Sequence, residues 1–402
     1  MTASVVARSA ATVPAVTDTG AATIADMAAD MIERGVRRVH VLAWRDLDDD
    51  DAGGSEVHAD EFMRRWAAAG LEITHRTSAA VGRPPEADRN GYHVVRRGSR
   101  YSVFPRTAVA EVLGRMGPFD ALVEIWNGVP WFSPVWCRRP RITVLHHVHG
   151  PMWDQILPRP LAGLGRALEA RLAPPFYRRT SVVTPSEATR DELIGLGFRP
   201  DRVTAVHNGV DPFFSPGPER SPTPLVVAVG RFAPVKRFEV TIAAAVEARR
   251  HVPELRLRLV GDGPLRGELE RLVASHGAGD WVTFTGRVAG ERLRDEYRRA
   301  WVVASGSLAE GWGLTLTEAA ACGTPAVATD IPGHRCSVVD GVTGVLASPD
   351  ALGAALTAVL TDGARRQSLA DAALARAAIL TWEASATGVL RALHGEVARQ
   401  PH

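Results

Sequence analysis

The sequence predicts an α/β protein built from two doubly wound domains with parallel sheets. Short apolar runs rich in β-branched residues alternate with segments of helical periodicity along almost the entire chain, as expected for repeated βαβ units. A chain of 402 residues is also too long for one ordinary hydrophobic core. We therefore expect two domains that face each other across a cleft, with ligands at the carboxyl ends of the strands.

The expected strands share β-branched composition and flanking turn residues. They lie at 37–44, 71–77, 120–126, 141–147, 181–185 and 202–208 in the first half, and at 225–230, 255–260, 281–286, 300–305 and 325–329 in the second half. Helices are expected between several of them. In segment 55–69, for example, Ala59, Phe62, Met63 and Trp66 recur with helical spacing before Gly70.

A proline-rich segment marks the domain boundary. Residues 208–224 contain five prolines without apolar periodicity, which is typical of an interdomain linker. The expected organisation is an extension at 1–36, an N-terminal domain at 37–215, a C-terminal domain at 222–380 and a closing helix at 381–402. The extension is expected to form an extra helix near residues 23–36. The closing helix has an apolar stripe at Ala386, Val389, Leu390, Leu393 and Val397 and is expected to pack back toward the N-terminal domain.

Composition excludes several classes of protein. A net charge of +2 does not indicate a nucleic-acid-binding protein, and no apolar run is long enough to cross a membrane. The three cysteines are far apart and odd in number, which indicates neither a disulfide framework nor a zinc site. The first twenty residues lack the apolar segment of a signal peptide, so we expect a cytoplasmic location.

The loop after the first strand contains four consecutive aspartates and two glycines. We interpret Asp48 to Asp51 as a solvated charged loop rather than a metal site, because consecutive aspartates lack a defined ligand geometry. Gly53 and Gly54 precede a helix and would let a ligand approach the amides at its start, which favour anions. Ser55 as an ordinary N-cap explains the same residues equally well.

The strand at 141–147 ends in a histidine cluster, His146, His147 and His149. A metal site is disfavoured because no acidic or cysteine partner has suitable spacing nearby. A hydrogen-bonding role at the edge of the cleft is favoured, since neutral imidazole both donates and accepts. His147, His149 and the nearby Trp153 are candidates for the acceptor side, although core packing is the default for tryptophan.

The only lysine of the chain follows the first strand of the second half. Of 47 basic residues only Lys236 is lysine, and Arg231 lies five positions before it. Both follow a strand end that we expect to face the cleft, where an arginine fork and a lysine point charge suit phosphate.

Two glutamates flank a glycine-rich turn in the segment AEGWGLTLTEAAACGTPAVATD, residues 309–330. Thr315 and Glu318 have the spacing of a helix capping box, which would make Glu318 structural and Glu310 a solvated loop residue. The alternative is that both carboxylates bind a ligand.

Together these segments resemble the family-4 retaining glycosyltransferases of the GT-B fold, over about residues 37–400. The segment EGWGLTLTE is similar to the family's motif of two glutamates separated by seven residues. The family pattern is also seen in GRFAPVKR, in residues 186–211 and in residues 330–346.

The resemblance implies a role for each matching position. Glu318 would hold the ribose of a nucleotide sugar, and Glu310 would hold a hydroxyl of its sugar. The amides of Gly313, Leu314 and Thr315 would receive the diphosphate, and Gly311, Trp312, Gly53 and Gly54 are further candidates for donor binding. Arg231 and Lys236 would neutralise the leaving phosphate, and the base would meet Arg287 and Val288. His146 matches the histidine beside the donor sugar, with His147 and His149 as alternatives.

The implied activity is transfer of a hexose-type sugar from a UDP- or GDP-linked donor to an acceptor hydroxyl, with retention and without a metal or other cofactor. The acceptor is a small molecule, a glycan or a lipid-linked compound, which leaves peripheral membrane contact open. A nucleotide-sugar epimerase on the same fold and a catalytically silent binding subunit are the alternatives. The retained Glu310, Arg231 and Lys236 favour an active transferase.

Overall fold

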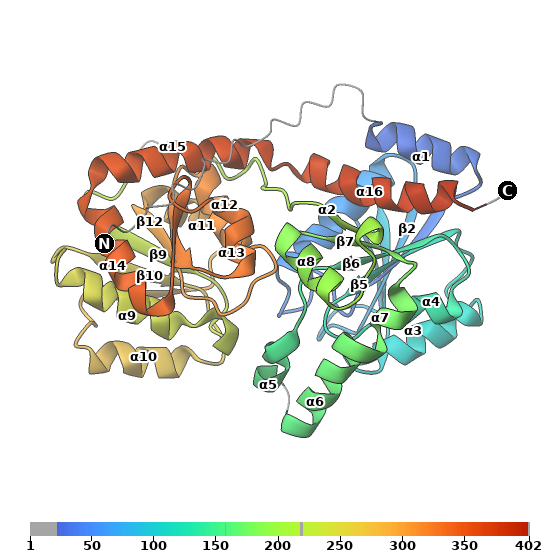
Figure 1. Ribbon diagram of the computed structural model, residues 1–402, viewed down its shortest axis with the longest axis horizontal. Helices are drawn as coiled ribbons and strands as arrows, with labels where there is room; N and C mark the ends of the chain where they lie inside the picture. The colour runs from blue at the N-terminus through green and yellow to red at the C-terminus, as the bar shows by residue number, and fades with distance from the viewer. Residues whose placement is uncertain (1–21, 157, 218–219, 401–402) are drawn as a thin grey trace, which may run out of the picture.

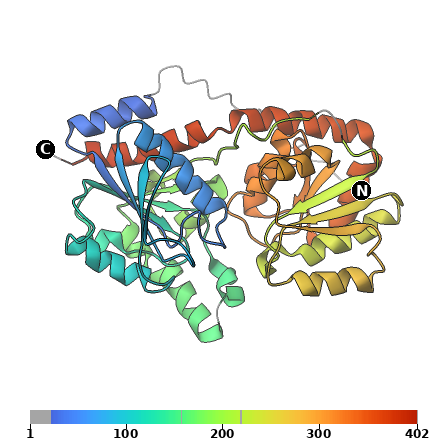
Figure 2. The same cartoon turned by 180° about the vertical axis from the view of Figure 1, so that it is seen from behind.

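The computed structural model describes residues 22–156, 158–217 and 220–400. Two sheets form separate halves of the molecule, and the last two helices of the chain run one after the other along one side of both halves (Figure 1). Viewed from behind, the same two halves are again distinct (Figure 2). The predicted architecture of two α/β domains with parallel sheets is therefore confirmed. None of the helices in the described ranges is long and apolar enough to cross a membrane.

The N-terminal domain contains a sheet of eight strands in the order β3-β4-β2-β1-β5-β6-β7-β8, all parallel except β3. The strands are β1 (Arg38–Leu42), β2 (Glu72–Thr77), β3 (Glu86–Arg89), β4 (Tyr92–Arg96), β5 (Ala121–Trp126), β6 (Arg141–Leu145), β7 (Ser181–Thr184) and β8 (Val203–Ala205). The helices are α1 (Ile24–Glu33), α2 (Gly54–Ala68), α3 (Val103–Val112), α4 (Ser133–Trp136), α5 (Trp153–Ile156), α6 (Arg159–Ala167), α7 (Pro174–Tyr177) and α8 (Glu187–Gly195).

The C-terminal domain contains a six-stranded parallel sheet in the order β11-β10-β9-β12-β13-β14. Its strands are β9 (Leu225–Val229), β10 (Arg256–Val260), β11 (Val282–Gly286), β12 (Val302–Ser305), β13 (Ala326–Thr329) and β14 (Gly344–Ala347). The helices that follow β9 are α9 (Phe238–Arg249), α10 (Arg266–Ser275), α11 (Glu291–Arg299), α12 (Leu314–Ala321), α13 (Pro332–Ser337), α14 (Leu352–Thr361), α15 (Gly363–Ile379) and α16 (Trp382–Ala398). The chain reverses its strand order between β9 and β12, which is where ligands bind in such sheets.

Helix α16 ties the end of the chain to the N-terminal domain. Its apolar stripe is buried in the same cluster as Val39 and Val41 of β1, and it packs against α1 and α2. Figure 1 shows α15 over the C-terminal domain and α16 continuing over the N-terminal domain beside α1. The extra helix expected near residues 23–36 is α1, while residues 1–21 of the expected extension lie outside the described residues.

Three strands were not expected from the sequence. Strands β3 and β4 form an antiparallel hairpin at the sheet edge, joined at Asn90 (φ 48°) and Gly91 (φ 87°). Positive φ at both turn residues is the geometry that Asn-Gly favours, so the dipeptide was a usable signal. The polar sequence of β3 hid it, because an edge strand need not bury either face. Strand β14 is four residues long and contains a glycine.

Two chain segments cross between the domains side by side. Val210 N donates to Leu380 O at 2.9 Å, and Val210 forms a β-bridge with Thr381. The crossing leaves no room for a side chain at Gly209, because a Cβ there would lie 2.2 Å from Trp382 N. The linker and the start of α16 therefore form one packed junction.

Substitution of Gly209 tests this junction. Gly209→Ala is expected to lower the free energy of unfolding by about 1–3 kcal/mol, because backbone atoms must move to accept the methyl group. Gly195→Ala is the matched control, since Gly195 ends α8 and a Cβ there meets nothing within 4 Å. Urea unfolding measures both variants. Equal stability of the two would contradict the close packing.

Candidate functional site

Lys236 and Glu310 form an ion pair at the carboxyl ends of adjacent strands. Lys236 ends a short 3-10 turn, Pro234–Lys236, between β9 and α9, and Glu310 lies between β12 and α12. Lys236 Nζ donates to Glu310 Oε1 at 2.6 Å, and Ser307 Oγ donates to the same oxygen at 2.8 Å. Because β9 and β12 are neighbours in the sheet, the two loops meet over its switch point.

Glu310 is held as a carboxylate. Burial alone would raise its pKa, but Lys236 and His334, together with the hydrogen bonds from Lys236 and Ser307, lower the pKa below its usual value. His334 is itself buried, and its Nδ1 lies 2.7 Å from Thr329 O. Burial lowers the pKa of His334, while the charge of Glu310 acts to raise it. The capping-box interpretation, which made Glu310 a solvated loop residue, is therefore wrong for this glutamate.

Helix α12 begins with free backbone amides. Its N-cap is Gly313, which has φ 93° and provides no side-chain hydrogen bond, and no acidic residue lies in the first turn. The first amides of a helix have no partner within the helix and attract anions. The capping box expected from Thr315 and Glu318 is wrong, because the helix begins at Leu314 and Thr315 lies inside its first turn.

Glu318 instead binds Tyr297 of α11. Tyr297 Oη donates to Glu318 Oε2 at 2.7 Å. Burial raises the pKa of Glu318 to about 7, although this hydrogen bond acts to lower it. Glu318 thus lies one helical turn from the start of α12 as a carboxyl group that titrates near neutrality.

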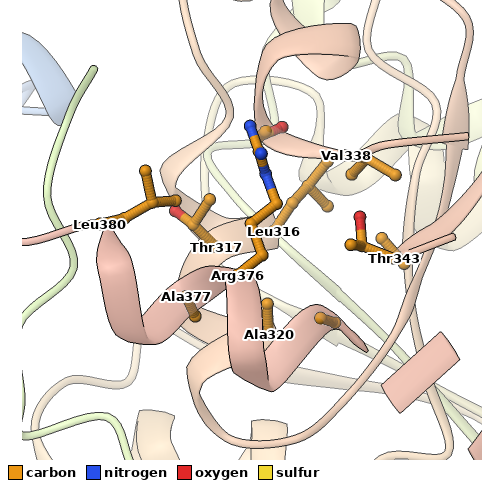
Figure 3. Close-up of a pocket in the computed structure, with 11 residues that line it drawn as sticks. Leu316, Thr317, Ala320, Val338, Thr343, Arg376, Ala377 and Leu380 are labelled. Carbon is orange, nitrogen blue, oxygen red and sulfur yellow. The ribbon is translucent and has the colours of Figure 1, made fainter. Parts of the chain in front are cut away.

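The rear face of α12 is closely packed. A cavity of only about 10 Å³ lies between α12, α15 and the segment before β14, and its lining includes Leu316, Thr317 and Arg376 (Figure 3). This volume is about that of one water molecule and excludes a larger ligand. A ligand is therefore not expected to bind on this face of α12.

The start of α12 meets the N-terminal domain. A Cβ on Gly311 would lie 2.6 Å from His146 O, so only glycine permits this approach. A Cβ on Gly54 would lie 2.9 Å from Leu314 Cδ1, which places the starts of α2 and α12 against each other. The N-cap of α2 is Gly53, whose N donates to Glu56 Oε2 at 2.8 Å, so the alternative of Ser55 as N-cap is wrong.

His146 is the end of a buried hydrogen-bonded chain. Its Nε2 lies 3.0 Å from His58 Nδ1, and His58 Nε2 lies 3.2 Å from Ser385 Oγ of α16. Burial lowers the pKa of His146 to about 4, so the imidazole is neutral at pH 7. Its other nitrogen, Nδ1, is buried without a hydrogen-bond partner among the described residues.

His147 and His149 stack on each other with ring centroids 4.5 Å apart. Burial, together with the charges of His149, His146 and Lys236, lowers the pKa of His147 well below its usual value. Trp153 is 6% exposed and donates its Nε1 to Glu169 Oε2 at 3.2 Å, which leaves little ring surface for a ligand. In the described ranges, no group of three or more His, Cys, Asp or Glu side chains is placed to hold a metal ion.

The acidic loop after β1 bridges the domains. Arg231 Nη1 donates to Asp51 Oδ1 at 2.7 Å, and Arg287 Nη1 donates to Asp50 O at 3.1 Å. Arg100 binds both Asp49 and Asp51 at 2.8 Å, and Asp49 is buried. The expectation of a solvated charged loop is therefore wrong. The arginines of β4, of the following loop and of the C-terminal domain neutralise its carboxylates.

The two remaining predicted residues pack against other side chains. Trp312 is 2% exposed, and its ring is tilted against that of His207 with the centroids 5.0 Å apart. Val288 packs against the apolar cluster of Leu225, Val227, Val260 and Ala300.

Several residues that contact the predicted site residues were not themselves predicted from the sequence. Ser307, His334, Asp51 and His58 each contact a predicted residue or influence its charge, and Glu56 caps α2 at Gly53. A signal existed for Ser307, which lies three residues before Glu310 on the same strand-end loop. The sequence contained no such signal for His58, because its partners are distant in the sequence.

Two family models match the chain. The model described as "Glycosyltransferase Family 4" matches residues 52–213, and the model described as "Glycosyl transferases group 1" matches residues 211–376. A D-inositol 3-phosphate glycosyltransferase of Kribbella flavida is 30% identical, over 90% of this chain and 96% of the relative. The corresponding protein of Frankia alni is 36% identical, over 85% of this chain and 94% of the relative.

Solved structures show the same fold at low sequence identity. Sucrose-phosphate synthase of Thermosynechococcus elongatus has a TM-score of 0.78 at 21% identity, covering 90% of this chain and all of that chain. HepE of Anabaena in complex with UDP-glucose has a TM-score of 0.69 at 18% identity, covering 88% of this chain and 98% of that chain.

Removal of the ion-pair cation tests the electrostatics of the site. Lys236→Met is expected to lower the free energy of unfolding at pH 7 by about 1–3 kcal/mol, because Glu310 becomes a carboxylate without its cation. Glu310 contributes stability above its ordinary pKa of 4.5, and that contribution is lost as pH falls through its lowered folded pKa. The deficit of Lys236→Met should therefore shrink below pH 4.5.

Urea unfolding at several pH values measures this deficit. The double variant Lys236→Met/Glu310→Gln is the control, since the glutamine carries no charge to leave unpaired, and it should recover part of the loss. A Lys236→Met protein as stable as the wild type at pH 7 would show that the pair contributes nothing.

Proposed function

This chain belongs to glycosyltransferase family 4, with the GT-B fold, and we propose that it transfers a hexose from a UDP-linked donor to an acceptor hydroxyl with retention at the anomeric carbon. The observation that carries the proposal is the Lys236–Glu310 ion pair beside the uncapped start of α12. The Lys236 cation, the Glu310 carboxylate and the free amides of α12 meet there, next to the N-terminal domain.

The arrangement suits the charge that develops in the reaction. Cleavage of a sugar–phosphate bond moves negative charge onto the diphosphate and leaves an oxocarbenium-like sugar. Amides of Leu314 and Thr315 at the start of α12, with Lys236 and Arg231, are placed to stabilise that diphosphate. The helix amides are fixed by the fold, so they stabilise the developing charge without reorganisation. We propose that the reaction needs no metal ion for this step.

Donor binding must compete with an internal carboxylate. Arg231 is paired with Asp51 across the cleft, and a diphosphate that binds Arg231 has to displace this partner. Arg100 also binds Asp51 and remains available to hold it. The exchange therefore releases one interdomain contact and replaces it with contacts through the donor.

The two glutamates would recognise the sugars at the two ends of the diphosphate. Glu310 accepts from Lys236 and Ser307 through Oε1, which leaves Oε2 for a hydroxyl of the donor sugar. Glu318 would accept from the ribose hydroxyls, as the family pattern implies. Glu310 is already bound to Lys236, which makes it a poor nucleophile, and Glu318 is assigned to the ribose. Neither glutamate is therefore assigned the role of a glycosidase nucleophile.

The histidines are assigned to the sugar and acceptor side. His146 is neutral, touches Gly311 through its backbone, and has Nδ1 free for a ligand hydroxyl. His147 and His149 follow it toward the part of the cleft where the acceptor would enter. Neutral imidazoles there can donate or accept a hydrogen bond without adding charge.

Names of related proteins suggest the substrates to try first. Five of the similar solved structures contain UDP or UDP-glucose, and sequence relatives at 30–36% identity are described as D-inositol 3-phosphate glycosyltransferases. We therefore propose UDP-hexoses as donors and a phosphorylated cyclitol as the first acceptor to test. GDP-linked donors are the comparison.

An activity assay tests the proposal. The protein is incubated with UDP-glucose, UDP-N-acetylglucosamine or GDP-mannose, with and without D-inositol 3-phosphate and with EDTA. Acceptor-dependent UDP release is expected, and NMR should show an α-linked product. Glu310→Gln should lower kcat/KM by about tenfold to a hundredfold, the loss of a charged hydrogen bond. Glu291→Gln, an exposed carboxylate on α11, is the control.

Other outcomes distinguish the alternatives. Conversion of the donor into an isomer without an acceptor would identify an epimerase. UDP binding by calorimetry without turnover on any acceptor would favour a silent binding subunit. Absence of UDP and GDP binding would contradict the donor site.

Titration of Glu318 gives a separate test of the ribose contact. Ribose hydroxyls donate to the carboxylate form, so UDP should bind more weakly as pH falls below the pKa of about 7. The dissociation constant should rise by up to about tenfold per pH unit. UDP itself titrates equally in Glu318→Gln, so the ratio of the two dissociation constants isolates Glu318. A ratio independent of pH between about pH 5 and pH 8 would contradict the contact.

A further inference from the structure

A second cavity lies in the N-terminal domain, apart from the candidate site. It has a volume of about 670 Å³ and is formed by β2, β4, α3 and the residues that follow α3. Both views show α3 on the side of the N-terminal domain that faces away from the C-terminal domain (Figures 1 and 2). None of its lining residues belongs to the donor site proposed above. The volume is in the range of small-molecule pockets.

Arginine dominates the lining of this cavity. Arg76, Arg97, Arg106 and Arg115 line it, against a single carboxylate, Glu86. Glu86 is bound to Arg97 at 2.5 Å and so neutralises only one of the four guanidinium groups. Within the described residues, no carboxylate lies within 4.0 Å of a nitrogen of the other three arginines. The cavity therefore has an unbalanced positive charge.

Arg76 is the most unusual of these residues. Its side chain is fully buried, and its terminal nitrogens donate to backbone carbonyls, including Val95 O at 3.2 Å and Arg97 O at 2.8 Å. Its Nε has no hydrogen-bond partner among the described residues. The nearest attraction comes from Glu111, but both oxygens of that carboxylate already bind His40 Nδ1, at 2.9 and 3.0 Å.

The charge of Arg76 is therefore not compensated by any carboxylate among the residues that the structure describes. Burial, together with the charges of Arg97 and Arg106, lowers its pKa to about 10, so the guanidinium remains positive at neutral pH. A buried cation without a partner is costly, and an anion in the cavity would remove that cost. Backbone carbonyls orient the Arg76 guanidinium but cannot neutralise it.

We propose that this arginine pocket binds the phosphate monoester of a small soluble metabolite. Guanidinium groups from a strand and from a helix face one cavity, and their forks match phosphate oxygens. Arg106 and Arg115 are exposed at the rim and would attract the anion, while Arg76 supplies fixed charge at the wall. The rest of the cavity, lined by Thr74, His93 and Pro105 among others, accommodates the organic part of the ligand.

A lipid headgroup offers the same phosphate chemistry. Val109, which lines the cavity, is 53% exposed, as a membrane-facing helix would require, so the experiment needs a lipid arm. The cavity volume of about 670 Å³ favours the soluble ligand, because it is in the range of pockets that enclose small molecules.

Calorimetry with glucose 6-phosphate and with inorganic phosphate tests the proposal, at ionic strength matched with chloride. The pocket variant Arg106→Gln/Arg115→Gln removes two exposed charges and is not expected to disturb the fold. Arg178→Gln/Arg179→Gln, at the end of α7, removes two exposed charges elsewhere and is the matched control. Glucose is the uncharged probe. Vesicles of phosphatidylcholine, with and without an equal amount of phosphatidylglycerol, form the lipid arm.

The expected result is binding of one glucose 6-phosphate per chain that glucose does not reproduce. The pocket variant should weaken it by about tenfold or more, the loss of at least one charge-assisted hydrogen bond, and the control should not. Absence of binding, or equal binding by wild type and pocket variant, would overturn the proposal. Binding to phosphatidylglycerol vesicles without binding of glucose 6-phosphate would contradict the proposal that the ligand is a soluble metabolite. A phosphate that binds in the donor cleft would bind the pocket variant as tightly as the wild type, which distinguishes the donor cleft from the arginine pocket.

Discussion

The Lys236–Glu310 ion pair is the interaction on which the candidate site depends. Lys236 is the only lysine of the chain, and its partner lies on a loop from the neighbouring strand. By joining the two loops, the pair fixes the residues that follow Glu310. Gly311 is held against His146 of the other domain, and Gly313 begins α12 without a side-chain cap. One partly buried charge pair thus places a cation, a carboxylate and free helix amides around one point.

The contacts between the domains explain how such a site can open. The linker and the start of α16 pack closely at Gly209, whereas the contacts at the cleft are polar and include Arg231 with Asp51 and Arg287 with the backbone of Asp50. Ion pairs between partly exposed side chains contribute little net stability, so a diphosphate can replace them. We infer that the packed junction holds the domains together while the polar contacts exchange with the donor. Asp51 of the acidic loop thus binds Arg231 at the position that the diphosphate of the donor would take.

Much of the fold could be predicted from the sequence because it follows from periodicity. Strand positions, the domain pair and the closing helix all depend on patterns of apolar residues that are local in the chain. The site residues that hold one another were harder to predict, since their contacts join distant segments. His58 reaches His146 and Ser385, and Asp51 reaches Arg231, through folding alone. The capping box at Thr315 failed for a related reason: the left-handed Gly313 starts the helix earlier, which frees Glu318 to bind Tyr297.

We propose that the start of α12, with Lys236 and Arg231, receives the diphosphate of a nucleotide donor. A crystal structure of the protein with UDP tests this proposal. We expect the β-phosphate within hydrogen-bond distance of the Leu314 and Thr315 amides, with Arg231 turned from Asp51 toward the phosphate and the ribose at Glu318. A UDP bound elsewhere, or a diphosphate that leaves Arg231 on Asp51 and does not touch the start of α12, would contradict it.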